Sequence, residues 1–226
     1  REVVGAPASL IPFLAHDEAN RALMGTHMQC QAVPLLIPQS PVVGTGMESS
    51  IASTMGRVVR AIDDGTVVFA DGAAVVFETK DGQQYTYNVE KFKRSAQSTC
   101  YNQKVLVGAG QKVKKGDVLI EGPAGQDGEL ALGTNVTVAY MSFDGLGYED
   151  AIVISDRLVR EDLLTSVHIE EYEASVVDTK LGIEETTKDI PNVGEEALRN
   201  LDEDGIVVVG AEVSPNDILV GKIAPK

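Results

Sequence analysis

The sequence has no tryptophan, only two cysteines and three histidines, and aromatic residues make up 5% of its 226 positions. Cys30 and Cys100 stand far apart with no paired spacing, which predicts free thiols in a reducing compartment rather than a disulfide framework. Two isolated cysteines and three scattered histidines also exclude a clustered zinc site. No apolar run approaches the roughly 18 residues of a membrane span, and no charged-then-apolar leader is present, so neither a transmembrane helix nor a signal peptide is predicted.

Motifs of a self-contained enzyme are missing as well. Gly108-Ala-Gly110 is not followed by Gly-Lys-Ser or Gly-Lys-Thr, so there is no P-loop. No nucleophile, base and acid have the spacing of a hydrolase. The 43% apolar composition is enough for an ordinary core, so one or two folded domains are expected. Because the chain starts at Arg1 and stops in mid-pattern at residue 226, we expect a piece of a longer protein.

Charge is abundant but unevenly placed. The net charge of −15 argues against a simple nucleic-acid binder, because phosphate contacts need lysine and arginine. Residues 144–217 are strongly acidic, whereas residues 91–115 contain no acid. The basic residues of that segment are Lys91, Lys93, Arg94, Lys104, Lys112, Lys114 and Lys115. They predict either a solvated face or a patch for nucleic acid or an acidic neighbour.

The pattern along the chain is mostly that of strands. Residues 66–70, 74–79 and 84–89 are β-branched or aromatic runs separated by Asp-Gly pairs, which predicts hairpins within a small all-β module. Outside these hairpins we expect buried strands over residues 135–141 and 151–155 and an alternating strand over residues 167–177. A short helix or turn is expected over residues 158–164 and a short helix over residues 195–201. Residues 51–60 form an ambiguous, mostly extended stretch.

Two segments about 100 residues apart, 108–119 and 209–220, are alike. Each has Gly, then Val, then a turn ending in Asp, then an apolar strand, and the Asp can cap the turn by accepting backbone N–H groups. The unit is similar to turns of barrel-sandwich hybrid modules. Biotin and lipoate carriers share such modules, but their exposed lysine at a hairpin tip has no counterpart in this sequence.

Residues 7–34 carry the densest pattern. Acidic residues at 17 and 18 favour a helix start and Gly25 a left-handed helix end, so a helix over residues 17–24 is predicted. Polar residues then alternate with apolar ones over residues 27–32, which indicates a strand with Gln31 on its polar face. Arg21 stands four residues after Asp17, as in a helical ion pair, but its guanidinium also suits phosphate.

A second candidate site is the adjacent pair Glu149 and Asp150, which closes a turn-rich loop. Carboxylate oxygens are ligands for divalent cations, provided that the loop lets both side chains face one way. In a regular strand they would point to opposite faces. Solvation of the turn is the alternative explanation.

These residues also carry a resemblance to a known family. The chain resembles the β subunit of bacterial multisubunit RNA polymerase over nearly its whole length, least so between residues 50 and 90. The closest agreement is in Pro7-Ala-Ser-Leu-Ile-Pro-Phe-Leu14, His16-Asp17, Ala19-Asn-Arg-Ala-Leu-Met-Gly25, Met28-Gln29 and Gln31-Ala-Val-Pro34. Residues 178–182, 189–193 and 198–206 resemble the start of the β flap. Departures from the family pattern are Ala15, Glu18, His27, Ala96 and the pair Leu146-Gly147, which replaces a usual Tyr-Asn.

The resemblance implies a mainly β fold built from three parts. Residues 1–45 and 132–166 would be pieces of a double-psi β-barrel, residues 46–131 an inserted sandwich-barrel hybrid module, and residues 167–226 the incomplete base of the flap. A few short helices would accompany these parts.

The resemblance also implies roles for the candidate residues. Arg21 would contact nucleotide phosphates, Gln31 would approach RNA, and Glu149 with Asp150 would lie near a second catalytic Mg²⁺. The primary Mg²⁺ ligands would belong to β′, so no cofactor is expected for this chain alone, which should be inactive. Implied partners are the β′ and α subunits, DNA template, transcript, and sigma and elongation factors through the flap, all in the bacterial cytosol and without a membrane. A structural β scaffold that docks proteins without chemistry is the alternative function.

Overall fold

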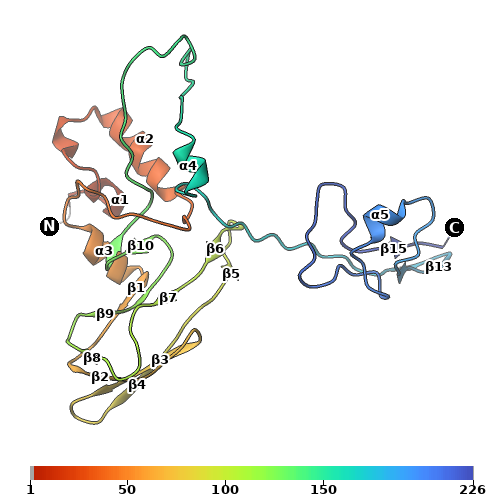
Figure 1. The fold of residues 1–226 in the computed structure, drawn as a ribbon, viewed down its shortest axis with the longest axis horizontal. Helices are drawn as coiled ribbons and strands as arrows, with labels where there is room; N and C mark the ends of the chain where they lie inside the picture. Colours follow the sequence, from red (N-terminus) through yellow and green to blue (C-terminus); the bar gives the residue numbers. More distant parts are fainter. Residues whose placement is uncertain (1–2, 226) are drawn as a thin grey trace. The chain divides into compact units, whose positions relative to one another are not determined.

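The computed structural model describes residues 3–225, which form mainly short strands joined by turns (Figure 1). The mainly β class predicted from the sequence is confirmed, and none of the sheets in this described range closes into a barrel. The helices are α1 (Ala6–Ser9), the 3-10 helix η1 (Leu14–His16), α2 (Ala19–Cys30), α3 (Glu48–Thr54), α4 (Arg157–Arg160) and α5 (Glu195–Leu198). The strands are β1 (Val58–Arg60), β2 (Gly65–Ala70), β3 (Ala74–Thr79), β4 (Gln84–Asn88), β5 (Lys93–Arg94), β6 (Cys100–Tyr101), β7 (Lys104–Val105), β8 (Lys112–Val113), β9 (Val118–Glu121), β10 (Gly125–Gln126), β11 (Glu129–Leu130), β12 (Asp178–Thr179), β13 (Gly182–Ile183), β14 (Glu185–Thr186) and β15 (Lys222–Ile223).

The chain divides into two compact units, one ending at Glu170 and the other beginning at Glu171. The first unit holds the largest sheet, with strand order β4-β3-β2-β8, and a three-stranded sheet, β1-β9-β7, both antiparallel. These two sheets share one core. Its fully buried side chains are Phe77, Leu119, Ile120, Val67 and Val75. Burial of each is worth about 1.5–3 kcal/mol, so this core is the main source of stability in the first unit.

The predicted hairpins are confirmed, because β2, β3 and β4 pair in sequence. Asp71 makes the first turn by accepting the backbone N–H groups of Ala73 and Ala74 on Oδ1, each at 2.7 Å. Gly65 opens β2 where the sheet is tight, since a Cβ there would lie 2.1 Å from the Glu78 carbonyl oxygen. The turn chemistry and the missing side chain together fix the register of the sheet.

A smaller cluster lies beside this core. Ile51, Ala52, Val58 and Leu130 are buried together, so that α3 packs on β1 and β11. The stretch 51–60 was expected to be mostly extended, and this is wrong for its first part, which is helical. The apolar residues Ile51 and Ala52 lie on the face of this helix that packs into the cluster.

The prediction for α2 is also wrong at its end. The helix runs through Gly25 to Cys30, so residues 27–30 are helical and the strand expected over residues 27–32 does not form. Its start is capped by Glu18, which accepts the backbone N–H of Arg21 at 2.9 Å. Glycine lowers helix propensity by only about 1 kcal/mol, which the flanking helix-forming residues offset.

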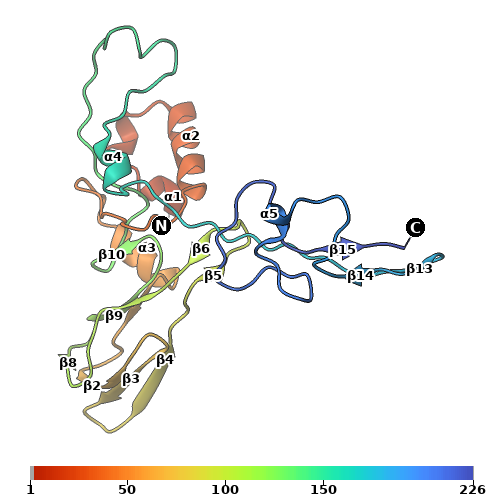
Figure 2. The ribbon, with the colours of Figure 1, turned by 45° about the vertical axis from the view of Figure 1, so that its right-hand side comes forward.

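Residues 134–156 were expected to contain buried strands, and this is wrong. They form no strand, and from residue 135 on they are exposed, with Tyr140 98% and Ile152 85% accessible. In both views this segment, coloured green to teal, arches away from α2 and α4 (Figures 1 and 2). The segment is rich in apolar residues, but no strand in the described range pairs with it.

The second unit consists of two small antiparallel pairs, β12-β13 and β14-β15, with α5 beside them. The alternating strand expected over residues 167–177 is wrong, because only the isolated bridge of His168 to Thr99 forms within it. The short helix or turn expected over residues 158–164 is confirmed as α4, and the short helix expected over residues 195–201 is confirmed as α5, each helix being shorter than the predicted segment.

The internal repeat is confirmed in its hydrogen bonds. Asp117 Oδ2 accepts the backbone N–H of Lys114 at 2.8 Å, and Asp217 Oδ2 accepts that of Ser214 at 2.9 Å. The third residue of each turn is left-handed, with φ 91° at Gly116 and 77° at Asn216. Glycine and asparagine are the residues that this turn position favours.

Along the described part of the chain, no helix combines the length and the apolar character that crossing a bilayer requires.

Candidate functional site

Arg21 lies on the first turns of α2 with its side chain exposed. Its guanidinium donates to Met24 Sδ at 3.7 Å, and within the described residues no ion pair joins it to Asp17. The predicted helical ion pair is therefore absent from the structure. Among residues 3–225 no carboxylate contacts the guanidinium N–H groups, so they remain available to an anion.

Gln31 is the last residue of the same helix region, at the C-cap of α2. Its side-chain amide nitrogen Nε2 is hydrogen-bonded with His27 Nε2, 2.8 Å away. Arg21 and Gln31 are ten residues apart, roughly 15 Å along the helix axis. One rigid element thus presents both residues, at two separate points.

Glu149 and Asp150 occupy the centre of a turn closed by the backbone bond from the Ala151 N–H to the Tyr148 carbonyl, 3.3 Å. Both side chains are exposed, and Glu149 is left-handed with φ 57°. This conformation interrupts the strand alternation that would send neighbouring side chains to opposite faces. Oxygen donors of this kind suit Mg²⁺, but a pair supplies only part of a coordination shell.

No complete metal site exists along residues 3–225, since nowhere do three histidine, cysteine or acidic side chains group to hold an ion. The acidic pair belongs to the arching segment 134–156, whereas Arg21 and Gln31 belong to α2. The structure therefore brings Arg21 and Gln31 onto one element and leaves Glu149 and Asp150 on another.

The basic segment is spread over three sheets. Lys93 and Arg94 lie in β5, Lys104 in β7 and Lys112 in β8, and these strands belong to different sheets. Some of its charge is used locally. Lys93 pairs with Glu90 at 2.8 Å, Arg94 Nε donates to the Ile169 carbonyl at 3.1 Å, and Lys91 Nζ donates to the Gln103 carbonyl at 2.7 Å.

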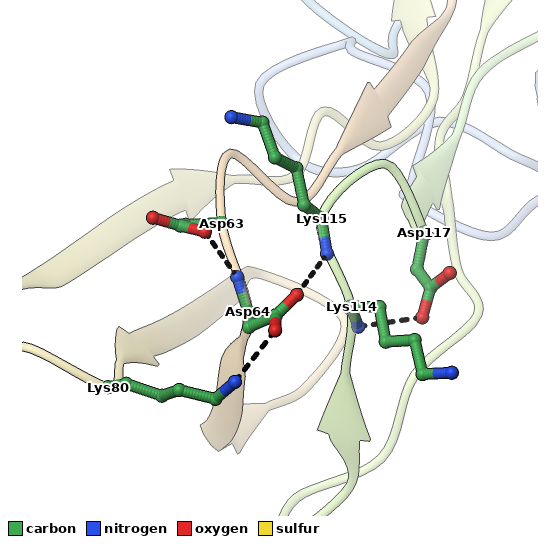
Figure 3. A network of polar contacts seen from close by, with 6 residues as sticks. All are labelled: Asp63, Asp64, Lys80, Lys114, Lys115 and Asp117. Carbon is green, nitrogen blue, oxygen red and sulfur yellow. Dashed lines mark hydrogen bonds and ion pairs between the residues drawn. The ribbon is translucent and has the colours of Figure 1, made fainter.

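Asp64 organises the other end of this segment (Figure 3). Its carboxylate pairs with Lys80 at 2.7 Å and accepts the backbone N–H of Lys115 at 3.0 Å. The hydrogen bond from Lys80 and that from Lys115 lower the pKa of Asp64. The side chains of Lys114 and Lys115 point away from the carboxylate, so both ammonium groups face outward (Figure 3).

Sequence reasoning missed Asp64 and the buried Glu48. Glu48 is 6% exposed and accepts the backbone N–H groups of Thr45 and Gly46, both at 2.8 Å. Each carboxylate accepts hydrogen bonds from main-chain N–H groups of a loop. No spacing of side chains in the sequence predicts such bonds. The Asp-Gly-rich surroundings of Asp64 and the Gly-Thr-Gly run before Glu48 indicate only that loops lie there.

Comparison with known proteins gives a consistent result. The family model described as RNA polymerase Rpb2, domain 6, matches residues 60–226. The chain is 58% identical over 226 residues to the DNA-directed RNA polymerase subunit beta of Chloroflexus aggregans and 54% identical over 226 residues to that of Caldicellulosiruptor bescii. Each alignment covers 100% of this chain and 18% of the relative, so the chain spans about a fifth of the relatives' length. Arg21 and Gln31 lie outside the family-model match but inside the alignments with these relatives.

Proposed function

Because the chain belongs to the family described as RNA polymerase Rpb2, domain 6, we propose that it acts as part of the β subunit of a bacterial DNA-directed RNA polymerase, a nucleotidyltransferase. The observation that carries the proposal is the alignment of the whole chain with subunits of that name at 54–58% identity. Its partners would be the β′ and α subunits, DNA and the transcript, with sigma and elongation factors at the flap. Its setting would be the bacterial cytosol.

Within that enzyme we assign α2 to the nucleotide and RNA side of the active centre. Arg21 would bind the phosphates of the incoming ribonucleotide, and Gln31 would contact the RNA. The exposure of Arg21 and the absence of a carboxylate partner within the described part of the chain support this role. Guanidinium groups offer a rigid fork of donors that matches phosphate oxygens.

Glu149 and Asp150 would act on the second Mg²⁺ of the intact polymerase as outer or partial ligands, with the primary ligands supplied by β′. Bound Mg²⁺ would stabilise the charge that develops during phosphoryl transfer. The two carboxylates fit this indirect role, since they are exposed and share one turn. Leu146 and Gly147 lie in the same loop where the family usually has Tyr-Asn, so an aromatic contact there is not part of the proposal.

We also propose the three-part division of the chain into double-psi barrel pieces, an inserted sandwich-barrel hybrid module and the flap base. The two antiparallel sheets β1-β9-β7 and β4-β3-β2-β8, which share one core, support the inserted module. The exposed apolar segment 134–156 is what an incomplete barrel would leave uncovered.

The test is transcript elongation by reconstituted polymerase carrying Arg21→Ala, measured against nucleotide concentration. Loss of one charge-assisted bond of about 1.5–3 kcal/mol should raise the apparent KM for nucleotide about ten- to a hundredfold. Arg21→Lys keeps the positive charge but lacks the forked donors of the guanidinium. Its apparent KM for nucleotide should lie between the values of wild type and Arg21→Ala. Arg199→Ala, an exposed arginine at the end of α5, is the matched control and should change nothing.

An unchanged nucleotide dependence in Arg21→Ala would remove α2 from the active centre. It would favour the alternative function, a β scaffold that docks other proteins without chemistry of its own. The closed core of β2, β3 and β9 is equally compatible with that function.

A further inference from the structure

The pair Asp144-Gly145 lies in the segment 134–156 that arches away from α2 and α4 (Figures 1 and 2), and we propose that it is a site of spontaneous aspartate isomerisation. An aspartate followed by glycine can close into a cyclic imide, because glycine has no side chain to hinder the approach of its own nitrogen. The chain contains six Asp-Gly pairs, so the sequence alone singles out none of them. They are Asp64-Gly65, Asp71-Gly72, Asp81-Gly82, Asp127-Gly128, Asp144-Gly145 and Asp204-Gly205.

The reaction needs the aspartate carboxyl group and the glycine N–H group to be free at the same time. The glycine nitrogen attacks Cγ of the aspartate, a C–N bond forms, and the carboxyl hydroxyl leaves with the amide proton as water. A second water molecule then opens the imide at either carbonyl. Opening at Cγ restores aspartate, whereas opening at the main-chain carbonyl leaves isoaspartate, in which the main chain runs through the side-chain carbons. The water lost in the first step is replaced in the second, so no other reagent is consumed.

In two of the six pairs the carboxylate is held. Asp64 pairs with Lys80 at 2.7 Å and accepts the backbone N–H of Lys115 at 3.0 Å. Asp71 accepts two backbone N–H groups of its own turn, each at 2.7 Å. These carboxylates must give up a hydrogen bond before the glycine nitrogen can attack them.

In three further pairs the glycine N–H is held. The N–H groups of Gly82 and Gly205 donate to the carbonyls three residues earlier, at 3.0 and 3.1 Å. The Gly128 N–H donates to Glu121 Oε1 at 3.1 Å. Gly128 and Gly205 are also buried, so in these pairs the nitrogen is fixed away from its aspartate.

Asp144-Gly145 is the remaining pair, and both of its reacting groups are free. Both residues are exposed, and no hydrogen bond or ion pair among residues 3–225 engages the Asp144 carboxylate or the Gly145 N–H. The pair forms the centre of a turn, with φ 48° at Asp144 and 72° at Gly145. This turn is closed by the Leu146 N–H, which donates to the Phe143 carbonyl at 2.9 Å. The closing bond joins the residues on either side of the pair and therefore occupies neither reacting group.

Isomerisation changes the loop that carries the candidate acidic pair. The main chain gains one methylene group at position 144, and the carboxylate moves onto Cα. The turn cannot keep its shape, because its left-handed backbone conformation belongs to an ordinary α-linked residue. Glu149 and Asp150 follow in the same loop, so the modification shifts both carboxylates. The reaction is a property of the chain itself and does not depend on the proposed function.

The test is incubation of the folded 226-residue chain in H₂¹⁸O, followed by proteolysis in ordinary water and mass spectrometry of the six Asp-Gly peptides. Each imide that opens leaves one heavy oxygen in the product, so label uptake measures the reaction whether aspartate or isoaspartate forms. The same chain in guanidinium chloride gives the unfolded rate of each pair and removes the effect of neighbouring sequence. Asp144 should take up label in the folded chain at nearly its unfolded rate. The need to break one hydrogen bond should slow each of the other pairs about fivefold or more.

Asp144→Glu keeps the charge but would have to form a larger ring, so it should abolish label uptake in its peptide. Asp81→Glu makes the same change at a held pair and should leave the labelling of Asp144 unchanged. The proposal is overturned if folding slows Asp144 as much as the other pairs, or if a held pair takes up label as fast as Asp144 in the folded chain. Absence of isoaspartate at position 144 in the folded chain, when the unfolded chain forms it, would also overturn the proposal.

Discussion

Among single residues, Glu48 shows how a buried carboxylate can hold a loop. Burial alone would raise the pKa of this carboxyl, but backbone N–H groups of Thr45, of Glu48 itself and of Gly46 bond the charged form and lower the pKa below its ordinary value of 4.5. A group whose pKa is lowered in the folded state adds stability above its unfolded pKa. That contribution is lost as the pH falls from about 4.5 through the folded pKa.

Glu48→Gln tests this dependence. The amide keeps the shape but not the charge, and its N–H₂ end faces a backbone donor, so the free energy of unfolding should drop by about 1–3 kcal/mol at pH 7. The difference from wild type should shrink as the pH falls below 4.5, because the wild-type carboxyl then takes up a proton. Urea unfolding of both proteins at pH 7, 5, 4 and 3 measures this difference in the free energy of unfolding.

Glu129→Gln is the control for that series, since Glu129 is an exposed acid on β11. It should change the free energy of unfolding by less than about 0.5 kcal/mol at each pH. A Glu48→Gln difference that stays constant from pH 7 to 3 would contradict the sign given for Glu48.

At the scale of elements, α2 can be tested through its central glycine. Gly25 lies inside the helix, and a Cβ there would lie 3.8 Å from Ile11 Cδ1, which is ordinary van der Waals contact. Gly25→Ala should therefore raise the free energy of unfolding by about 0.5–1 kcal/mol. Thermal denaturation, with Gly110→Ala beside it, measures the effect.

Gly110 is the matched control because a Cβ there would not clash either, with nothing within 4 Å, yet its φ is 81°. Alanine is strained in that conformation, so Gly110→Ala should destabilise. Destabilisation by Gly25→Ala as well would mean that α2 ends at Gly25, as the sequence alone predicted.

Elements with local determinants were predictable, and those that need distant partners were not. The hairpins β2-β3-β4 follow from β-branched runs and Asp-Gly turns, and the repeated turns follow from Gly116, Asn216 and their aspartates. The end of α2 was missed because a glycine stop is a weak preference. The buried strands expected over residues 135–141 and 151–155 were wrong, because apolar residue types do not supply a pairing strand and none in the described range pairs with this segment.

The candidate site divides in the same way. Arg21, Gln31, Glu149 and Asp150 were named from their residue types and from family resemblance, and the structure gives their elements and exposure. A cavity of about 240 Å³ in the first unit, with Gln29 and Thr134 among its lining residues, could not be predicted from the sequence, because five separate stretches of chain line it. A spacing pattern reports one element at a time.

For the whole molecule, the main question is what covers residues 134–156. Side chains such as Tyr140, Tyr148 and Ile152 are 98%, 78% and 85% exposed, and apolar patches of this kind mark interaction sites. Under the proposed function, other parts of the polymerase cover these side chains. This chain is about a fifth of the length of its relatives, so most of the polymerase sequence lies outside it.

Hydrogen exchange tests that expectation. In the isolated chain, the exposed amides from residue 136 to 156 should exchange within seconds, whereas Val67, Phe77 and Ile120 in the core should be protected. In assembled polymerase the segment 134–156 should gain protection of at least a hundredfold, with the core amides as internal reference. Equal exchange in both samples would show that the segment stays solvated in the enzyme.

Each of the two compact units contains one aspartate-capped turn. One turn, around Asp117, lies in the first unit, and its equivalent, around Asp217, lies in the second, with the same bond closing both. Asp117→Ala and Asp217→Ala each remove the same carboxylate-to-N–H bond from turns that otherwise differ in sequence. One chain therefore allows the loss of this bond to be compared in both of its compact units.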